Sequence, residues 1–448
     1  MTATTTATAG PATEELVRRA RSVIPGGVNS SSRRLPGCED LTVVATDGAY
    51  FTTADGAEIA DFQCGFGATL LGHNDPDVNA AVAETAARTD LVGYGISAEE
   101  VALAERLVTH LPGAERVLLC NSGSEATFHA IRLARVATGR PLVVKFQGAY
   151  HGWSDTVLPG GVGTPADRLN TPYTAAAGLL PEVVAQTLVV PFNDLDAMRA
   201  VFAAHPGRIA AVIVEPILHA LGNVLPEDGF HAGVRDITAE HGAVMIFDEV
   251  VTGFRHALGG YQSLIGLTPD LTTFGKAVAN GYPIAGVAGR ADLMDGFATN
   301  PGGRAFFGGT FNGNPAMAAA ASACIDKLAA TDPYPEMFRL GDRIRTGMQE
   351  IFDEAGVSAV TSGFGSCFNT YFIPKRPVRR QEDVMDNDAD LYVGLRLEGV
   401  RHGVFEIPLA FKRSIVSAAH TDTEVDRLLE STRASLRTVL ARRAAGTR

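Results

Sequence analysis

The chain has 448 residues, of which 46% are hydrophobic, so it is long and apolar enough to bury a sizeable core. Its 38 Lys and Arg against 50 Asp and Glu give a formal net charge of −12 at pH 7, which argues against a protein that wraps nucleic acid. The five cysteines are widely spaced without a CxxC pair, and the histidines form no HExxH motif. We therefore expect neither a disulfide framework nor a metal site.

The first ten residues carry neither a basic region nor an apolar core, so we expect a disordered tail rather than a signal peptide. No run of about 18 uncharged apolar residues occurs, so no membrane span is predicted and we expect a cytoplasmic protein. A helix is predicted over 13–23, followed by a loop at 25–34. Short strands are predicted within 41–62, beginning with LTVVA at 41–45 and separated by Asp-Gly turns.

From about residue 75 onward, short apolar runs alternate with amphipathic segments. The runs lie at 117–120, 142–146, 187–191, 210–214, 243–247 and 283–289. Most of them are continuous rather than alternating, which is typical of strands covered on both faces. The pattern predicts an α/β fold with a mostly parallel sheet.

The last third of the chain has a different pattern. It is helical through 314–356, with strand-like segments near 366–373 and 413–417 and helices near 388–402 and 422–440. We interpret it as a smaller α+β domain that the N-terminal segment joins. The predicted organisation is 1–62 as part of the small domain, 63–325 as the large domain and 326–448 as the C-terminal small domain.

Residues 152–181 are rich in Gly and Pro and fit no regular element. A long irregular segment within a compact domain is typical of a functional lid or a disordered region.

Polar residues follow several predicted strands, and open parallel sheets bind ligands beyond the carboxyl ends of their strands. Ser122 and Glu125 have the spacing of a capping box at the start of a helix. The functional interpretation is an anion site, because Gly123 and Ser124 would present free amides at a positive helix end. The two interpretations compete in part, since a cap on Ser122 uses some of those amides.

Asp248 follows the run 243–247, and a carboxylate at the end of a buried strand is costly unless a partner pairs with it. Its neighbour Glu249 is an alternative functional acid, and either residue could instead cap a helix or pair with an arginine. Lys276 follows LTTFG in a Gly-rich apolar setting, where burial would lower its pKa and free the amine as a nucleophile. Among five lysines, Lys276 is the best candidate for a Schiff base. The others are Lys145, Lys327, Lys375 and Lys412.

Tyr150 and His151 follow a predicted strand, where an aromatic side chain either stacks on a flat cofactor or packs in the core. A phosphate site, a buried acid, an aromatic residue and a lone lysine together indicate pyridoxal 5'-phosphate (PLP). Nucleotide motifs fit less well. The segment GFGATLLG departs from GxGxxG at Leu70, and GGVGTPAD at 160–167 lacks the Lys-Ser/Thr of a P-loop.

These motifs resemble those of the class-III, fold-type I PLP-dependent aminotransferases, and among them the glutamate-1-semialdehyde 2,1-aminomutases. The similarity runs from residue 25 to residue 420. Its most specific pieces are NSGSEA, GAYHG, VEP, FDEVVTGFR, PDLTTFGKAVANGYP and GGTFNGNP. The resemblance implies a fold-type I α/β architecture with PLP or pyridoxamine phosphate bound in the large domain.

The resemblance also implies roles for individual residues. Lys276 would hold PLP covalently and act in catalysis with Asp248, the partner of the pyridinium nitrogen. Tyr150 and Val250 would lie on opposite faces of the ring, with His151 beside Tyr150.

Other implied roles concern the phosphate, the substrate and the partner subunit. Ser122, Gly123 and Ser124 would bind the phosphate. Thr310 would reach the phosphate held by a partner subunit, which implies a homodimer. Ser30 and Arg33 lie on a loop that would help form the substrate end of the pocket, and 152–181 matches a mobile gate.

Three departures from the aminomutase pattern stand out. His219 and Ala220 occupy the places of a Gly-Asn pair, and GTFNGNP replaces GTLSGNP. Lys412 stands where a glutamate is expected, with Arg413 beside it. This charge reversal is either drift in a solvated loop or the mark of a more anionic substrate.

Three hypotheses remain open. The first is an aminotransferase that moves an amino group from an amino acid to a small carbonyl acceptor, with an anionic group bound by Arg33, Arg34 or Lys412. The second is glutamate-1-semialdehyde 2,1-aminomutase, an enzyme of tetrapyrrole synthesis. The third is a PLP-fold protein that binds its cofactor or a partner without turnover.

Overall fold

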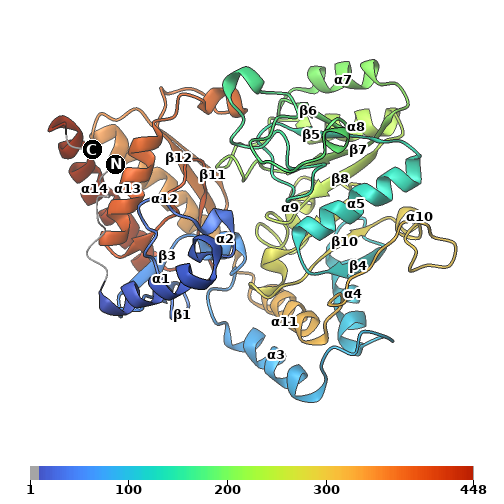
Figure 1. Cartoon of the computed structure of the whole chain (residues 1–448), viewed down its shortest axis with the longest axis horizontal. Helices are drawn as coiled ribbons and strands as arrows, with labels where there is room; N and C mark the ends of the chain where they lie inside the picture. The colour runs from blue at the N-terminus through green and yellow to red at the C-terminus, as the bar shows by residue number, and fades with distance from the viewer. Residues whose placement is uncertain (1–9, 447–448) are drawn as a thin grey trace.

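The computed structural model describes residues 10–446, so most of the predicted N-terminal tail lies outside the described residues. Figure 1 shows a larger part built on a broad sheet and, beside it, a smaller part that carries α1 (Pro11–Val23) and α14 (Asp422–Ala444). The helix predicted over 13–23 is confirmed by α1.

Seven strands form the central sheet in the order β4-β10-β9-β8-β7-β5-β6. Their bounds are β4 (Arg116–Cys120), β5 (Leu142–Phe146), β6 (Thr187–Val190), β7 (Ile209–Val214), β8 (Val244–Asp248), β9 (Leu271–Phe274) and β10 (Ala285–Gly289). Only β10 runs antiparallel to its neighbours, β4 and β9, while the other neighbours within this sheet are parallel. The predicted mostly parallel α/β sheet is confirmed.

Helices cover both faces of the central sheet, which explains the continuous apolar runs. On one face Val143 packs in a cluster with Ala130 and Leu133 of α5 (Gly123–Thr138). On the other face Val144 packs with Met198 and Val234 of helices α7 and α8. The helices of this part are α3 (Pro76–Arg88), α4 (Ala98–His110), α5, α6 (Pro181–Val184), α7 (Leu195–Ala204), α8 (Phe230–Glu240), α9 (Gly260–Leu264), α10 (Ala291–Met294) and α11 (Pro315–Thr331).

The smaller part holds two further sheets. One contains β11 (Val360–Phe364), β12 (Cys367–Tyr371) and β14 (Ser414–Ile415), and the other contains β1 (Ala45–Asp47), β2 (Tyr50–Thr52), β3 (Glu58–Asp61) and β13 (Val404–Phe405). The parallel pairing of β13 with β3 places the N-terminal segment against the C-terminal part of the chain. The helices here are α1, α2 (Cys64–Gly67), α12 (Tyr334–Glu354), α13 (Ala389–Arg401) and α14. The predicted boundary at 325/326 falls inside α11, so the three-part division stays a prediction.

The predicted strand at 41–45 is misplaced, because β1 begins only at Ala45. The turn at Asp47-Gly48 sets the register, pairing Ala45 with Thr52. The Val44 amide still donates to the Thr52 oxygen at 2.9 Å, but beyond Thr52 the chain turns again, with the Thr53 amide donating to the Ala57 oxygen at 2.9 Å. Residues 41–43 therefore have no strand to pair with. Val43 and Val44 accordingly lie more than half exposed, at 53% and 59%.

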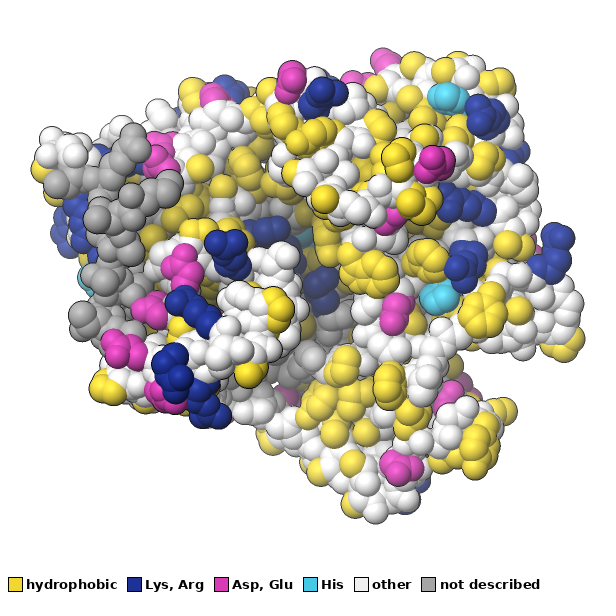
Figure 2. Space-filling view, viewed as in Figure 1, with side chains coloured by type: hydrophobic (Ala, Val, Ile, Leu, Met, Phe, Trp, Pro, Cys, Tyr) yellow, Lys and Arg dark blue, Asp and Glu magenta, His cyan; other side chains and the backbone are white. Residues whose placement is uncertain are grey.

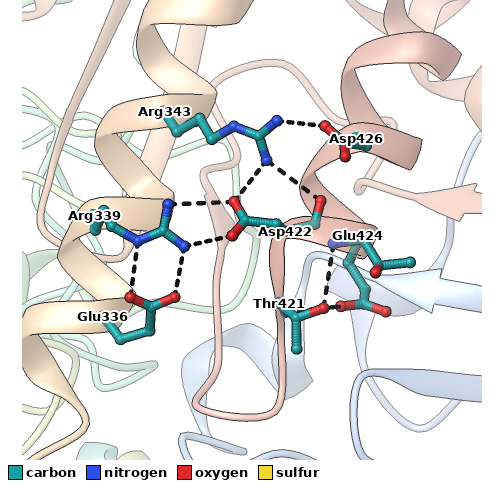
Figure 3. Close-up of polar contacts among 8 residues, drawn as sticks. Glu336, Arg339, Arg343, Thr421, Asp422, Glu424 and Asp426 are labelled. Atoms are coloured by element: carbon teal, nitrogen blue, oxygen red, sulfur yellow. Dashed lines mark hydrogen bonds and ion pairs between the residues drawn. The ribbon is translucent and has the colours of Figure 1, made fainter.

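Ion pairs join α12 to the start of α14 on the surface of the smaller part (Figure 3). Asp422 accepts from Arg339 at 2.7 Å and from Arg343 at 2.7 Å, and Arg343 also pairs with Asp426. Thr421 forms a capping box with Glu424 at the start of α14. The side chains of Arg339 and Asp422 are about half exposed, at 47% and 54%, so solvent and salt screen these pairs.

Long segments without regular structure join the elements of the larger part. Residues 152–180 contain only the short 3-10 helix Ala166–Arg168, as their composition predicts. All five cysteines lie buried as free thiols. Within residues 10–446, no helix combines the length and hydrophobicity that a membrane crossing requires.

Candidate active site

A cavity of about 440 Å³ lies at the carboxyl ends of the central strands, as expected for an open parallel sheet. Most of the residues predicted from the sequence line it together. These are Ser30, Ser122, Gly123, Ser124, Tyr150, His151, Asp248, Val250, Lys276 and Lys412. Figure 2 shows that the face in view is hollowed between the larger and the smaller part, with basic side chains in the hollow.

The start of α5 contributes an anion site to this cavity. Ser122 accepts from the Glu125 amide at 3.3 Å, and the Glu125 carboxylate accepts from the amides of Asn121 at 2.7 Å and Ser122 at 3.0 Å. The predicted capping box is therefore confirmed. The box does not use the amides of Gly123 and Ser124, so the cap and an anion site coexist at the positive end of the helix.

Gly123 is required by close packing. A Cβ atom on Gly123 would lie 2.6 Å from Cγ1 of Val250, closer than side chains tolerate. Gly152 has a similar environment, since its Cβ would meet the Ser124 Oγ at 2.5 Å. The two glycines let the helix start, the residues after β8 and the turn after β5 approach one another around the cavity.

Asp248 is 4% exposed and is held by three donors or partners at the end of β8. Its Oδ2 lies 2.7 Å from Nδ1 of His151, and its Oδ1 accepts from Thr273 Oγ1 at 3.0 Å and the Val250 amide at 3.1 Å. The neighbouring Glu249 instead accepts from Thr252 Oγ1 and from the amides of Tyr261 and Gln262, so it fixes the start of α9. Of the two candidate acids, Asp248 is the one that faces the cavity.

Lys276 follows β9 with a left-handed backbone conformation, at φ +47°, which is uncommon for a residue with a side chain. Residues held in such conformations cluster at functional sites. Burial, with a smaller contribution from the Arg413 charge, lowers the pKa of Lys276 to about 8, while Asp248 and Glu215 oppose the shift. An amine with this pKa has a minor but appreciable neutral fraction near physiological pH, and that fraction is available as a nucleophile.

Glu215 and Arg413 also line the cavity, although the sequence analysis assigned no role to either. Glu215 directly follows β7 and accepts from the Tyr150 amide at 2.7 Å and the His219 amide at 3.2 Å. Burial raises the pKa of the Glu215 carboxyl. The rule that polar groups at strand ends face the ligand site would have found it, since VEP follows an apolar run.

Arg413 is buried, at 6% exposed, and its guanidinium donates to the Phe66 oxygen at 2.9 Å and the His219 oxygen at 3.3 Å. Burial lowers the pKa of the neighbouring Lys412, and the Arg413 charge lowers it further. Lys412 therefore does not belong to a solvated loop. The departures from the aminomutase pattern at 412 and 413 place two additional cations at the cavity.

The departures at 219 and 220 behave differently from each other. Ala220 lines the cavity, whereas His219 lies behind it with Nδ1 2.6 Å from Asn223 Oδ1 and Nε2 3.3 Å from His256 Nε2. One ligand atom each from His219, His256 and Cys367 lie within 4.8 Å of one another, a grouping that sequence spacing does not reveal. Burial lowers the pKa of His256, and the charges of Arg255 and Arg413 lower it further. The same two cations oppose a metal ion there, so we assign no metal to the group.

Three predicted residues lie outside the cavity. Arg33 and Arg34 line a neighbouring cavity of about 740 Å³, which shares Ser32, Gly65 and Phe66 with the first. Thr310 is exposed at the surface before α11, so it does not reach the cavity of its own chain.

The cavity fits PLP by its donors and by its shape. The free helix end suits a phosphate, the anchored Asp248 suits a pyridinium nitrogen, and Lys276 supplies the amine. Within the described residues, Nε2 of His151 is buried without a hydrogen-bond partner, so this face of the cavity has an unused polar atom. The close approach at Gly123 and Gly152 keeps the phosphate end narrow.

Comparison with known proteins identifies the class of protein. The family model for class-III aminotransferases matches residues 35–397, and the chain belongs to this family. Its cofactor is PLP, and it is a PLP-dependent enzyme with the α/β architecture of fold-type I. The hypothesis of a protein without turnover therefore loses its support.

The chain's individual relatives include several aminomutases. Glutamate-1-semialdehyde 2,1-aminomutase of Pyrobaculum islandicum is 40% identical over 415 residues, which cover 92% of this chain and 96% of the relative. The aminomutase of Nitratidesulfovibrio vulgaris is 40% identical over 424 residues, covering 94% and 98%.

Similar solved structures include both an aminotransferase and an aminomutase. An omega-transaminase from Sphaerobacter thermophilus has a TM-score of 0.88 at 33% identity, covering 96% of this chain and 98% of its own. A glutamate-1-semialdehyde aminomutase from Pseudomonas aeruginosa, in complex with pyridoxamine phosphate, has a TM-score of 0.87 at 26% identity, covering 96% and 94%. The relatives at 40% identity favour the aminomutase hypothesis over the aminotransferase that the sequence departures suggested.

Proposed function

We propose that the chain is a glutamate-1-semialdehyde 2,1-aminomutase, which moves the amino group of its substrate from one carbon to the adjacent one. The observation that carries this proposal is the 40% identity to aminomutases over nearly the whole length of both chains. Such a reaction is an isomerisation, so it needs no separate donor and acceptor. It places the enzyme in tetrapyrrole synthesis, in the cytoplasm.

The residues of the cavity have distinct tasks in this proposal. Ser122, Gly123 and Ser124 bind the phosphate at the start of α5, and Tyr150 and Val250 enclose the ring from its two faces. When bound, PLP supplies an electron sink that stabilises negative charge on the substrate carbon next to nitrogen.

Asp248 and Lys276 carry the chemistry on the protein side. The hydrogen bonds from Thr273 and the Val250 amide fix the Asp248 carboxyl group, which would pair with the protonated pyridine nitrogen. His151, 2.7 Å from the same carboxylate, fixes its orientation. The Lys276 amine would act as general acid where one substrate carbon gains a proton and as general base where the adjacent carbon loses one.

We also propose a homodimer in which each subunit contributes to the cavity of the other. Thr310 is exposed in its own chain, as a residue that contacts a partner's phosphate must be. Ser30 and the segment 152–181 border the substrate side. Analytical ultracentrifugation combined with PLP titration of a Thr310→Ala variant tests this arrangement.

A single-substrate assay tests the proposed reaction. Purified protein in its pyridoxamine phosphate form is incubated with glutamate 1-semialdehyde alone, and 5-aminolevulinate is measured. We expect turnover without any second amino compound, and complementation of a 5-aminolevulinate auxotroph by the wild-type gene but not by Lys276→Ala. Turnover that requires a separate donor and acceptor would refute the aminomutase.

An aminotransferase with an anionic acceptor is the second candidate, and Lys412 with Arg413 is the observation that favours it. Two cations at the cavity, one of them replacing a family glutamate, suit an extra carboxylate or phosphate on the substrate. The test is to add a panel of amino donors one at a time and to follow the change in cofactor absorbance. With an anionic acceptor, the half-reaction of Lys412→Glu should then be roughly tenfold slower than that of Lys412→Met. With a neutral acceptor, the two variants should react at similar rates.

A further inference from the structure

Lys145 lies near the carboxyl end of β5, the strand next to the edge strand β6 of the central sheet, and has no exposed surface. It belongs to β5, and its Nζ donates to three main-chain oxygens: Ala149 at 3.0 Å, Val157 at 2.7 Å and Pro159 at 2.7 Å. An ammonium group has three protons, so the three acceptors match its donors one for one. Every proton of the buried cation is directed at the backbone of the segment that follows its own strand.

Burying this ammonium group costs free energy, so we expect it to perform a role in the protein. A buried ammonium without a contacting carboxylate loses its hydration, and burial lowers the pKa of Lys145 to about 7 despite the opposing effect of Glu215. A methionine would fill the same space without that loss. The three inward-pointing carbonyls, however, would then remain buried without a donor.

The three acceptors lie in two different segments. Ala149 begins the turn that carries Tyr150 and His151 into the cavity, whereas Val157 and Pro159 lie at the root of the irregular segment 152–181. The Lys145 ammonium therefore connects Ala149, in the turn at the cavity, to Val157 and Pro159, which lie at least eight residues further along the chain.

The same turn is anchored residue by residue to the rest of the cavity. The Tyr150 amide donates to Glu215 Oε1 at 2.7 Å, Thr127 Oγ1 donates to the His151 oxygen at 2.6 Å, and the His151 ring contacts Asp248. These contacts fix Tyr150 and His151 to β7, α5 and β8. Lys145 adds the contact that fixes the preceding residue to the long segment.

We propose that Lys145 is a positioning residue whose ammonium holds the turn 149–151 against residues 157–159, so that Tyr150 and His151 face the PLP ring. The proposal rests on the cofactor roles assigned above to those two residues. It adds a function for a lysine that does not touch the cavity.

Gln147 offers a matched control for the test. It is 1% exposed and lies two residues further along the chain, and its Nε2 donates to the oxygens of Gly160 at 2.9 Å and Gly161 at 3.2 Å. Gln147 thus anchors the long segment from the same strand end without contacting the turn 149–151.

The experiment compares wild type, Lys145→Met and Gln147→Leu. Apo-protein is titrated with PLP and followed by fluorescence and absorbance, and hydrogen–deuterium exchange is measured on the holoenzyme. We expect the Kd for PLP to rise roughly tenfold or more in Lys145→Met, with faster exchange across 149–159. Gln147→Leu should change the Kd less than about threefold, with faster exchange near 160–161.

An unchanged Kd for PLP in Lys145→Met would overturn the proposal. Equal increases of the Kd in Lys145→Met and Gln147→Leu would also overturn it, because any loosening of the segment would then have the same effect. Lys145→Gln keeps two N–H donors on a shorter side chain without the charge, and it carries the same test if Lys145→Met does not fold. Failure of wild-type protein to bind PLP would instead refute the proposed cofactor role, so the two failures are distinguishable.

Discussion

The cavity at the sheet and the ion-pair contact between α12 and α14 both concentrate charged residues, but in opposite surroundings. At the cavity, Asp248 and Arg413 are buried and held mainly by hydrogen bonds to fixed groups, and Lys276 lies partly buried beside them. At the helix contact, Arg339 and Asp422 are paired with each other yet remain about half exposed.

The difference shows that a charged residue can be paired with an opposite charge and still contribute little to function or stability. A buried charge interacts strongly with whatever faces it, and its pKa shifts as a result. An exposed ion pair replaces contacts that each charge would otherwise make with water, so its net contribution to stability is small. We therefore expect the largest functional effects where the charges are least paired by opposite charges.

The largest expected effect is at Lys276. Lys276→Ala removes the amine that moves the proton, so turnover should fall roughly 10³-fold or more, as measured by product formation. In wild-type apo-protein, the rate of reaction with PLP should rise with pH around a midpoint near 8, because the neutral amine is the reactive form. Lys375→Met, which removes an exposed lysine paired with Asp353, is the control. Turnover within tenfold of wild type in Lys276→Ala would refute the site.

A smaller effect is expected from filling the cavity wall. Gly123→Ala places a methyl group against Val250, whose branched side chain cannot move far without displacing its own backbone. We expect a loss of about 1–3 kcal/mol in PLP binding or stability, measured by titration and thermal unfolding. Adding Val250→Ala should recover part of the loss. A double variant as weak as the single one would show that Val250 is not the obstacle.

The smallest effect is expected at the helix contact. Asp422→Asn should shift the Tm by about 2 °C or less, since exposed pairs contribute little. Arg339 lowers the pKa of the Asp422 carboxyl in the folded state, so the contribution of Asp422 is present above the unfolded carboxyl pKa of about 4. As pH falls below that value, the difference between wild type and variant should shrink, and it should also shrink in 1 M salt. A Tm loss larger than that of Gly123→Ala would reverse the comparison.

Much of the sheet was predictable because its strands are short, continuous and apolar. The runs ending before Asn121, Gln147, Glu215 and Asp248 all became strands whose carboxyl ends meet at the cavity. β11 and β13 were not predicted. Residues 360–364 are only half-buried and include Thr, Ser and Gly, and β13 has only two residues, so neither carries a periodic signal.

The site residues were predictable where a residue type in a local sequence pattern indicates a single chemical role. Lys276 and the box of Ser122 with Glu125 follow from local pattern alone. Glu215 carried the same local signal, a polar residue directly after a strand, but received no role. Arg413 could not be found in this way, because it contacts Phe66 and His219, far earlier in the chain. The burial of Lys145 is equally invisible, since its acceptors are backbone atoms that any sequence would supply.

The pairing of β3 with β13 has a consequence for how the protein is made. Ala60 lies opposite Val404, so the N-terminal strands find their neighbour only when nearly the whole polypeptide has left the ribosome. The seven-stranded sheet needs no residue beyond Gly289 and can form earlier during synthesis. The last contacts to form therefore close the molecule from both ends of the chain, after the sheet that holds Lys276 already exists.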